Sequence, residues 1–208
     1  MSLEFLYLPL LYLHIGTGAL ALLTGAVAII SKKGKKTHKN WGKIFYVSML
    51  CASFAGIALA LLPNHFNLFL MVIGLFSSYL TISAYQALHY KSKNTVVPWQ
   101  QKALSIWALI MGVGMIGFGL VNGSLNLVLL IFGLVSSLFG FRDLRNYSKP
   151  KVLKENWLKM HLGKMMGAYI SAVTAFIVAN TIIPGIWAWF LPSIPGTFYI
   201  IYWSRKIS

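Results

Sequence analysis

The sequence predicts an all-α polytopic membrane helix bundle with seven transmembrane helices, and three observations predict it. Hydrophobic residues fill 58% of the 208 positions and charged residues only 10%, which is too little polar surface to cover a soluble globule. All 18 Lys and Arg residues fall in four short clusters, at 32–43, 91–102, 142–164 and 205–206. The apolar stretches between these clusters reach the roughly 20 residues that a bilayer crossing needs. We expect one integral membrane domain over residues 1–208.

The seven expected helices alternate between basic connections and uncharged turns. They cover, in chain order, residues 5–30, 43–62, 67–88, 103–121, 125–141, 164–183 and 185–204. Uncharged turns at 63–65, 122–124 and 184–185 separate the basic clusters. Because basic loops face the cytoplasm, we expect the N-terminus outside and the C-terminus in the cytoplasm. The last helix carries Pro192 and Pro195, so we expect it to bend or unwind between Leu191 and Gly196.

Two of these segments resemble each other, which suggests an internal duplication. Residues 67–78 and 126–137 both begin with Asn, carry Gly at the eighth position and end in Ser-Ser. Each is followed by a basic loop and then a Trp at the start of the next helix, Trp99 or Trp157. The chain therefore reads as three repeated helical hairpins plus one further helix.

Residues able to carry chemistry are few. The three acidic residues are Glu4, Asp143 and Glu155, and the pattern places none of them at membrane depth. Carboxylate-driven proton coupling and carboxylate-rich cation sites are therefore not expected. The single cysteine, Cys51, excludes an internal disulfide and a cysteine-based metal cluster. No catalytic residue can be assigned, so whether the chain is an enzyme stays open.

Histidines remain as the candidate ligands. We expect His38, His89 and His161 at the cytoplasmic ends of helices, where at least two of them would share a metal or haem iron, for which neutral imidazole is well suited. His14 lies in the outer part of the first helix and is a further cofactor candidate. The competing interpretations are interfacial histidine at helix ends and, for His14, a hydrogen bond to a neighbouring helix.

Two segments at the start of the chain carry a family resemblance. Leu13-His14-Ile-Gly-Thr-Gly and Thr37-His38-Lys-Asn-Trp-Gly42-Lys43 resemble the opening of an uncharacterised bacterial family of predicted multi-pass integral membrane proteins, a domain of unknown function. The resemblance covers chiefly residues 13–60. It implies a multi-pass fold in the bacterial cytoplasmic (inner) membrane, and it implies no activity.

Two classes of function are consistent with these observations. The first is a redox or cofactor protein that binds haem or a transition metal through histidines near the cytoplasmic face. The alternative is a small-molecule or lipid transporter or lipid-handling module, with polar residues along Tyr85, Gln86 and Asn180; a non-catalytic membrane scaffold is the third reading. We expect the lipid bilayer, with its anionic headgroups at the cytoplasmic face, as the partner. Nucleic acid is not expected, and a homo-oligomer is left open.

Overall fold

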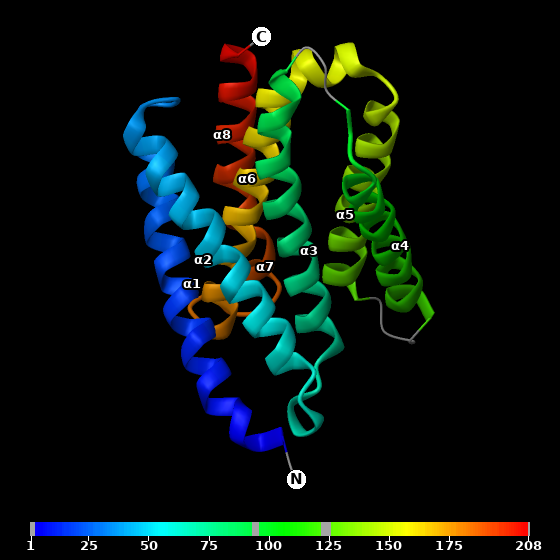
Figure 1. Ribbon diagram of the computed structural model, residues 1–208. Coiled ribbons are helices and arrows are strands. Elements are labelled where there is room, and N and C mark those ends of the chain that lie inside the picture. The colour runs from blue at the N-terminus through cyan, green and yellow to red at the C-terminus, as the bar shows by residue number, and fades with distance from the viewer. Residues whose placement is uncertain (1–2, 93–95, 122–125, 208) are drawn as a thin grey trace. The chain divides into compact units, whose positions relative to one another are not determined.

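The computed structural model describes residues 3–92, 96–121 and 126–207. Over these ranges the chain is all-helical, with eight α-helices, three 3-10 helices and no strand (Figure 1). The α-helices are α1 (Tyr7–Ile30), α2 (Lys36–Ala60), α3 (Leu68–Gln86), α4 (Trp99–Val121), α5 (Leu127–Tyr147), α6 (Pro150–Ala179), α7 (Trp187–Phe190) and α8 (Ser193–Lys206). The 3-10 helices are η1 (Leu3–Leu6), η2 (Pro63–His65) and η3 (Ala87–Lys91).

Six helices in the described part of the chain are long and apolar enough to cross a membrane. They are α1 to α6, so the chain is a membrane-integral helical protein. Several of them begin earlier than the apolar pattern predicted: α2 begins at Lys36 instead of residue 43, and α6 at Pro150 instead of residue 164. Lys and Arg are good helix formers and can direct their charged ends to water, so the helices continue into the basic segments.

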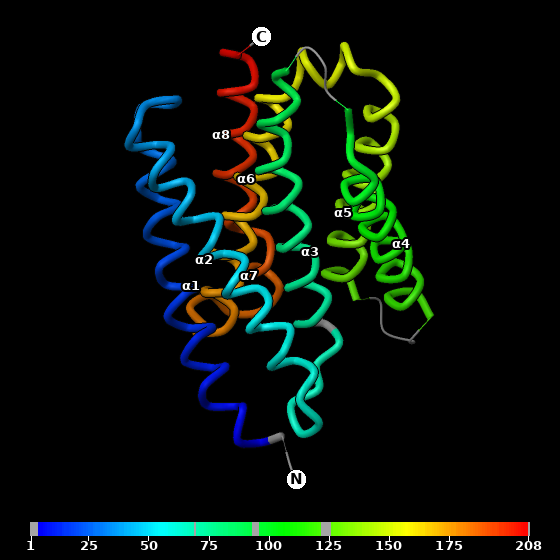
Figure 2. The backbone as a smooth tube through the Cα atoms, in the orientation of Figure 1, coloured from blue at the N-terminus to red at the C-terminus, as the bar shows by residue number. Residues whose placement is uncertain are grey.

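The seventh predicted segment is two helices. A break at Leu191 and Pro192 separates α7 from α8, and the segment can be followed in Figure 2. The predicted interruption between Leu191 and Gly196 is therefore confirmed. Pro195 lies in the first turn of α8, where a missing backbone donor costs nothing. With 14 residues, α8 is about 21 Å long, so a crossing by this segment stays a prediction.

The chain divides into two compact units. Unit 1 contains residues 1–82 and 165–196, and unit 2 contains residues 83–164 and 197–208. In unit 1, α1 packs along α2 (Figure 1). Near the N-terminus, Asn64 of η2 donates a hydrogen bond to the Glu4 carboxylate, which ties η1 to the turn after α2. The predicted single domain stays a prediction.

In unit 2, α4 packs along α5 at very short range. Glycines make this approach fit: a Cβ added at Gly112 would lie 2.6 Å from the Gly133 carbonyl oxygen, and one at Gly140 would lie 2.7 Å from the Ser105 carbonyl oxygen. Ser136 of α5 also donates to the Ala108 carbonyl of α4 over 2.8 Å. Small residues allow such backbone contact between membrane helices.

The two similar segments begin in the same way. The Asn67 side chain accepts a hydrogen bond from the Leu70 amide at 3.0 Å, and the Asn126 side chain accepts one from the Leu129 amide at 3.2 Å. Both asparagines therefore cap a helix N-terminus. This shared cap fits a duplication, although three repeated hairpins plus one helix stay a prediction.

Candidate functional site

An ion pair is buried among the helices of unit 2. Asp143 of α5 and Lys164 of α6 are 2% and 3% exposed. The Lys164 ammonium donates to both carboxylate oxygens of Asp143, over 2.6 Å to Oδ1 and 2.5 Å to Oδ2. Both residues belong to helices long and apolar enough to cross a membrane. A charge in such a place is costly unless it is paired, and it commonly marks function.

Serine hydroxyls from two more helices complete the surroundings of this ion pair. Ser83 of α3 accepts a hydrogen bond from Lys164 at 2.5 Å and donates to Asp143 Oδ2 at 3.2 Å. Ser105 of α4 donates to the same oxygen at 3.3 Å. Four helices thus contribute one polar group each, and these hydrogen bonds repay part of the cost of removing the charges from water.

The hydrogen bonds continue from the ion pair to a buried tyrosine. The Ser105 and Tyr147 hydroxyl oxygens are 3.0 Å apart. Since the Ser105 proton is directed to Asp143, the Tyr147 hydroxyl donates this bond. The Tyr147 ring meets the Tyr90 ring edge to face at 6.2 Å, and the Tyr90 hydroxyl donates to Gln101. Ionisable and hydroxyl groups linked in this way can hold a proton and pass it on.

The ion pair corrects the assignment of Asp143 to a basic loop, because Asp143 is buried within α5. Its depth in a membrane stays a prediction. The residue was assigned to a basic loop because Arg142 and Arg145 flank it, but α5 continues to Tyr147. The signal that could have found it is helical spacing, because Ser136, Gly140, Asp143 and Tyr147 are buried along one face of α5.

Two of the predicted histidines join α1 to α2 in unit 1. The His14 Nδ1 on α1 lies 2.8 Å from the Ala52 carbonyl oxygen of α2. In the opposite direction, the His38 Nδ1 on α2 lies 2.9 Å from the Ala28 carbonyl oxygen of α1. In each case the ring nitrogen donates, because a carbonyl can only accept. Ala28 lies within the last four residues of α1, whose carbonyls lack helical partners, so His38 also caps α1.

Lys33 caps the same helix end. Its ammonium donates to the carbonyl oxygens of Ala28 and Ile29, and partial burial lowers the pKa of Lys33 below its ordinary value. A cation at a helix C-terminus is favourable because the exposed carbonyls carry partial negative charge.

The other two predicted histidines differ from each other. The His161 Nδ1 lies 2.9 Å from the Ala84 carbonyl oxygen, near the end of α3. His161 is inside α6, because α6 begins well before the predicted residue. His89 lies in η3, with its Nδ1 3.3 Å from the Gln86 carbonyl of its own turn. Thus His161 and Lys164 of α6 bind the adjacent residues Ala84 and Ser83 of α3.

No three His, Cys, Asp or Glu side chains are grouped as ligands for one metal ion within the described ranges. A site made by two of His38, His89 and His161 stays a prediction. Among the polar residues considered for a transport path, Asn180 follows α6 and donates to the Phe176 carbonyl of that helix at 2.8 Å. The Gln86 Oε1 atom is buried without a hydrogen bond to the described part of the chain.

The fold and this site define a class: a multi-helix integral membrane protein with a charged pair inside its helix bundle. More particularly, the chain belongs to the predicted membrane protein family DUF2306, whose family model matches residues 11–114. The match includes His14, His38 and His89 and ends before Asp143 and Lys164. No curated protein and no solved structure matches the chain.

Proposed function

We propose that the protein is a proton-coupled membrane transporter in which the Asp143–Lys164 pair binds and releases the coupling proton. The observation that carries this proposal is the burial of the pair, 2% and 3% exposed, within helices long and apolar enough to cross a membrane. The electrostatic attraction within the pair exists only while both groups are charged. Protonation of Asp143 removes the attraction and leaves Lys164 as an uncompensated cation, which favours a second arrangement of the helices.

The broken seventh segment supports the same proposal. Discontinuous helices are a recurring feature of transporter sites, because irregular backbone at membrane depth needs a wet cavity or protein partners. The break at Leu191 and Pro192 gives the seventh segment this discontinuous form. Asp143 accepts hydrogen bonds from Ser83 and Ser105, and Ser105 is linked to the Tyr147 hydroxyl, so a chain of hydroxyl groups starts at the carboxylate that binds the proton.

The test needs no knowledge of the substrate. Purified protein in liposomes is adsorbed to a solid-supported membrane, and the transient current is recorded after a pH jump. We expect a current from the wild type and a loss of at least about tenfold in Asp143→Asn and in Lys164→Met, which remove the titrating pair. Glu155→Gln is the matched control, because Glu155 is exposed on α6. A folded Asp143→Asn variant with the full current would overturn the proposal.

The second candidate is a redox protein with haem or a transition metal held by His14, His38, His89 or His161. The favouring observation is that His14, His38 and His161 each donate from Nδ1 to a carbonyl of another helix. This bond fixes the tautomer and ring orientation and makes Nε2 the basic nitrogen, as second-shell bonds do for metal-binding histidines. Such a group would supply electron transfer. Orientation by a carbonyl also suits a purely structural bond, so this candidate is ranked second.

An absorption spectrum and metal analysis of the purified protein test this candidate. A haem band or stoichiometric metal that is lost in His38→Ala or His161→Ala would support it. A colourless, metal-free protein that stays colourless after incubation with haem would exclude it. We also propose the bacterial cytoplasmic membrane as the location, with anionic headgroups next to the basic loops.

A further inference from the structure

An exposed stripe on α8 lies outside the polar site. Phe198, Ile201 and Tyr202 are 69%, 43% and 59% exposed. Their spacing of three and four residues places them on one side of the helix. Arg205 and Lys206 follow in the last turn, and α8 contains no acidic residue. The stripe is therefore apolar at one end and doubly positive at the other.

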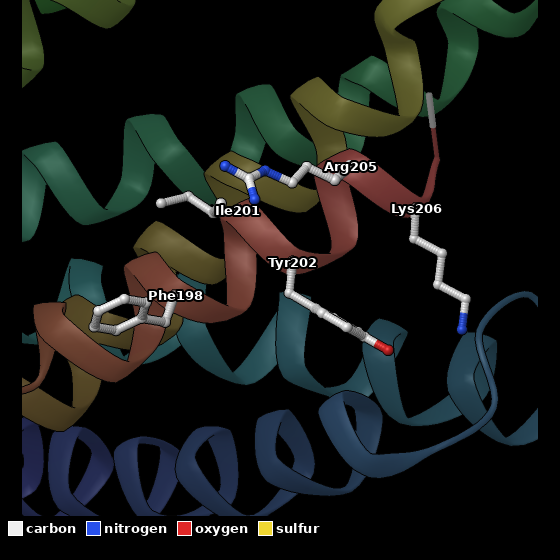
Figure 3. Close-up of a pocket in the computed structure, with 5 residues that line it drawn as sticks. All are labelled: Phe198, Ile201, Tyr202, Arg205 and Lys206. Carbon is white, nitrogen blue, oxygen red and sulfur yellow. The ribbon is translucent and has the colours of Figure 1, made fainter.

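These five side chains line an open hollow on the surface of α8. Figure 3 shows them projecting from α8, with Tyr202 and Lys206 directed to the same side of the helix. The Lys206 ammonium lies 5.9 Å from the centre of the Tyr202 ring and 5.2 Å from that of Trp203. Cation–π contacts of this kind hold the ammonium at the aromatic surface, so its position is set before any ligand arrives.

The stripe is short enough to fit within one leaflet of a bilayer. From Phe198 to Arg205 is seven residues, or about 10 Å along the helix axis. One leaflet of the hydrocarbon core is about 15 Å thick. With Arg205 and Lys206 at the level of the headgroups, Phe198 lies at the depth of acyl chains. Aromatic and basic residues are the usual anchors at this boundary.

We propose that the α8 stripe, formed by Phe198, Ile201, Tyr202, Arg205 and Lys206, is a specific site for one anionic phospholipid of the surrounding bilayer. Arg205 and Lys206 bind its phosphate group, and the three apolar side chains hold the first part of an acyl chain. Charge complementarity selects an anionic over a zwitterionic headgroup, because the last turn of α8 carries the two positive charges of Arg205 and Lys206 and α8 contains no acidic residue. The site is independent of the ion pair and of the transport proposal.

Native mass spectrometry tests the site with defined lipids. Wild-type protein in detergent is titrated with phosphatidylglycerol or phosphatidylcholine, and the bound lipid is counted. We expect one phosphatidylglycerol to bind with higher affinity than the others. The Arg205→Gln, Lys206→Gln double variant should lose roughly 30-fold in affinity for it, since each basic residue near an anionic surface contributes about fivefold. The matched control is Lys151→Gln with Lys154→Gln, two exposed lysines of α6.

Three outcomes would overturn the proposal. These are equal binding of the two lipids, an equal loss in the α6 control, and an unchanged affinity in the α8 double variant. If that variant does not fold, Phe198→Ala with Ile201→Ala keeps both charges and should weaken phosphatidylglycerol binding through the acyl chain. Unchanged binding in this second variant would also contradict the site, as would a dimer that forms through α8 in place of lipid binding.

Discussion

Asp143 and Lys164 each depend on the other, because both are buried and neither charge is stabilised by bulk water. The pair makes two direct contacts, and its serine partners make three more hydrogen bonds. Removing one charge leaves the other buried and uncompensated, whereas removing both leaves only a polar gap. Comparing the stability of the single variants with that of the double variant therefore measures the interaction energy between the two groups.

We expect Asp143→Asn and Lys164→Met each to lower the free energy of unfolding by about 3–5 kcal/mol. The double variant should be more stable than either single variant, since no unpaired charge remains. Thermal unfolding of the purified protein, followed by tryptophan fluorescence, measures this order. Glu155→Gln should unfold like the wild type because Glu155 is exposed. A double variant that loses the sum of the two single effects would show that the groups act independently.

The histidines allow a second comparison between residues. Replacing His38 by Ala removes a hydrogen bond between α1 and α2, which should cost about 1 kcal/mol in a membrane protein. His89→Ala is the control, because His89 is exposed and its Nδ1 lies 3.3 Å from the Gln86 carbonyl of its own turn. The same unfolding assay measures both variants. If the two shifts are equal, the bond to Ala28 does not stabilise the hairpin.

Individual site residues were predicted with mixed success, for a physical reason. His14 stands out because histidine is rare in apolar segments, and both His14 and His38 make defined contacts between helices. Asp143 was missed because Arg142 and Arg145, which flank it in sequence, are exposed and belong to a basic cluster. Burial on a helix depends on which face a residue occupies. A cluster of charges identified along the sequence does not distinguish the buried face from the exposed faces.

At the level of elements, the α4–α5 contact depends on glycine. A Cβ at Gly112 would lie 2.6 Å from the backbone of α5, whereas one at Gly114 would meet no atom within 4 Å. Gly112→Ala should therefore destabilise the protein by about 1–3 kcal/mol through overpacking. Gly114→Ala should be neutral or slightly stabilising, because Ala is the better helix former.

Unfolding of these two variants under identical conditions separates the packing effect from helix propensity. A Gly112→Ala variant as stable as Gly114→Ala would mean that α4 and α5 can separate without cost. The pairing of these helices would then be loose.

Helix positions could be read from the sequence, whereas helix ends could not. The six long apolar segments all became helices, because hydropathy reports the preference for lipid directly. The start of α6 was misplaced because a basic segment can be either loop or helix. Its conformation is decided by contacts such as that of Leu153, which is fully buried with Tyr90 and Tyr147.

For the whole molecule, the side of the membrane on which each connection lies is the main prediction still to be tested. Asn64 and Ser148 are exposed and lie after α2 and after α5. In a Cys51→Ala background, a cysteine at Asn64 should react with an impermeant maleimide from outside intact cells. A cysteine at Ser148 should react only after the cells are opened, because its loop is basic. Reaction of both from one side would contradict the orientation.

The arrangement of the whole chain could be predicted only in part. Hydropathy and charge indicated a multi-pass helical membrane protein, because both are properties of consecutive residues and can be read directly from the sequence. They carried no information on the division into two units, since that division depends on contacts between distant segments. Contacts between distant segments also decide whether the units form one domain and whether the seventh segment crosses the bilayer.

The buried ion pair also constrains how the protein is made. Asp143 leaves the ribosome before Lys164, and only Ser148 and Lys149 connect α5 to α6. If α5 entered lipid alone, its carboxylate would be an unpaired charge on an apolar helix, which is costly to insert. Waiting for α6 removes this cost, because the two charges then enter together. Biogenesis of unit 2 therefore favours release of α5 and α6 into the bilayer as one hairpin, after both helices have been synthesised.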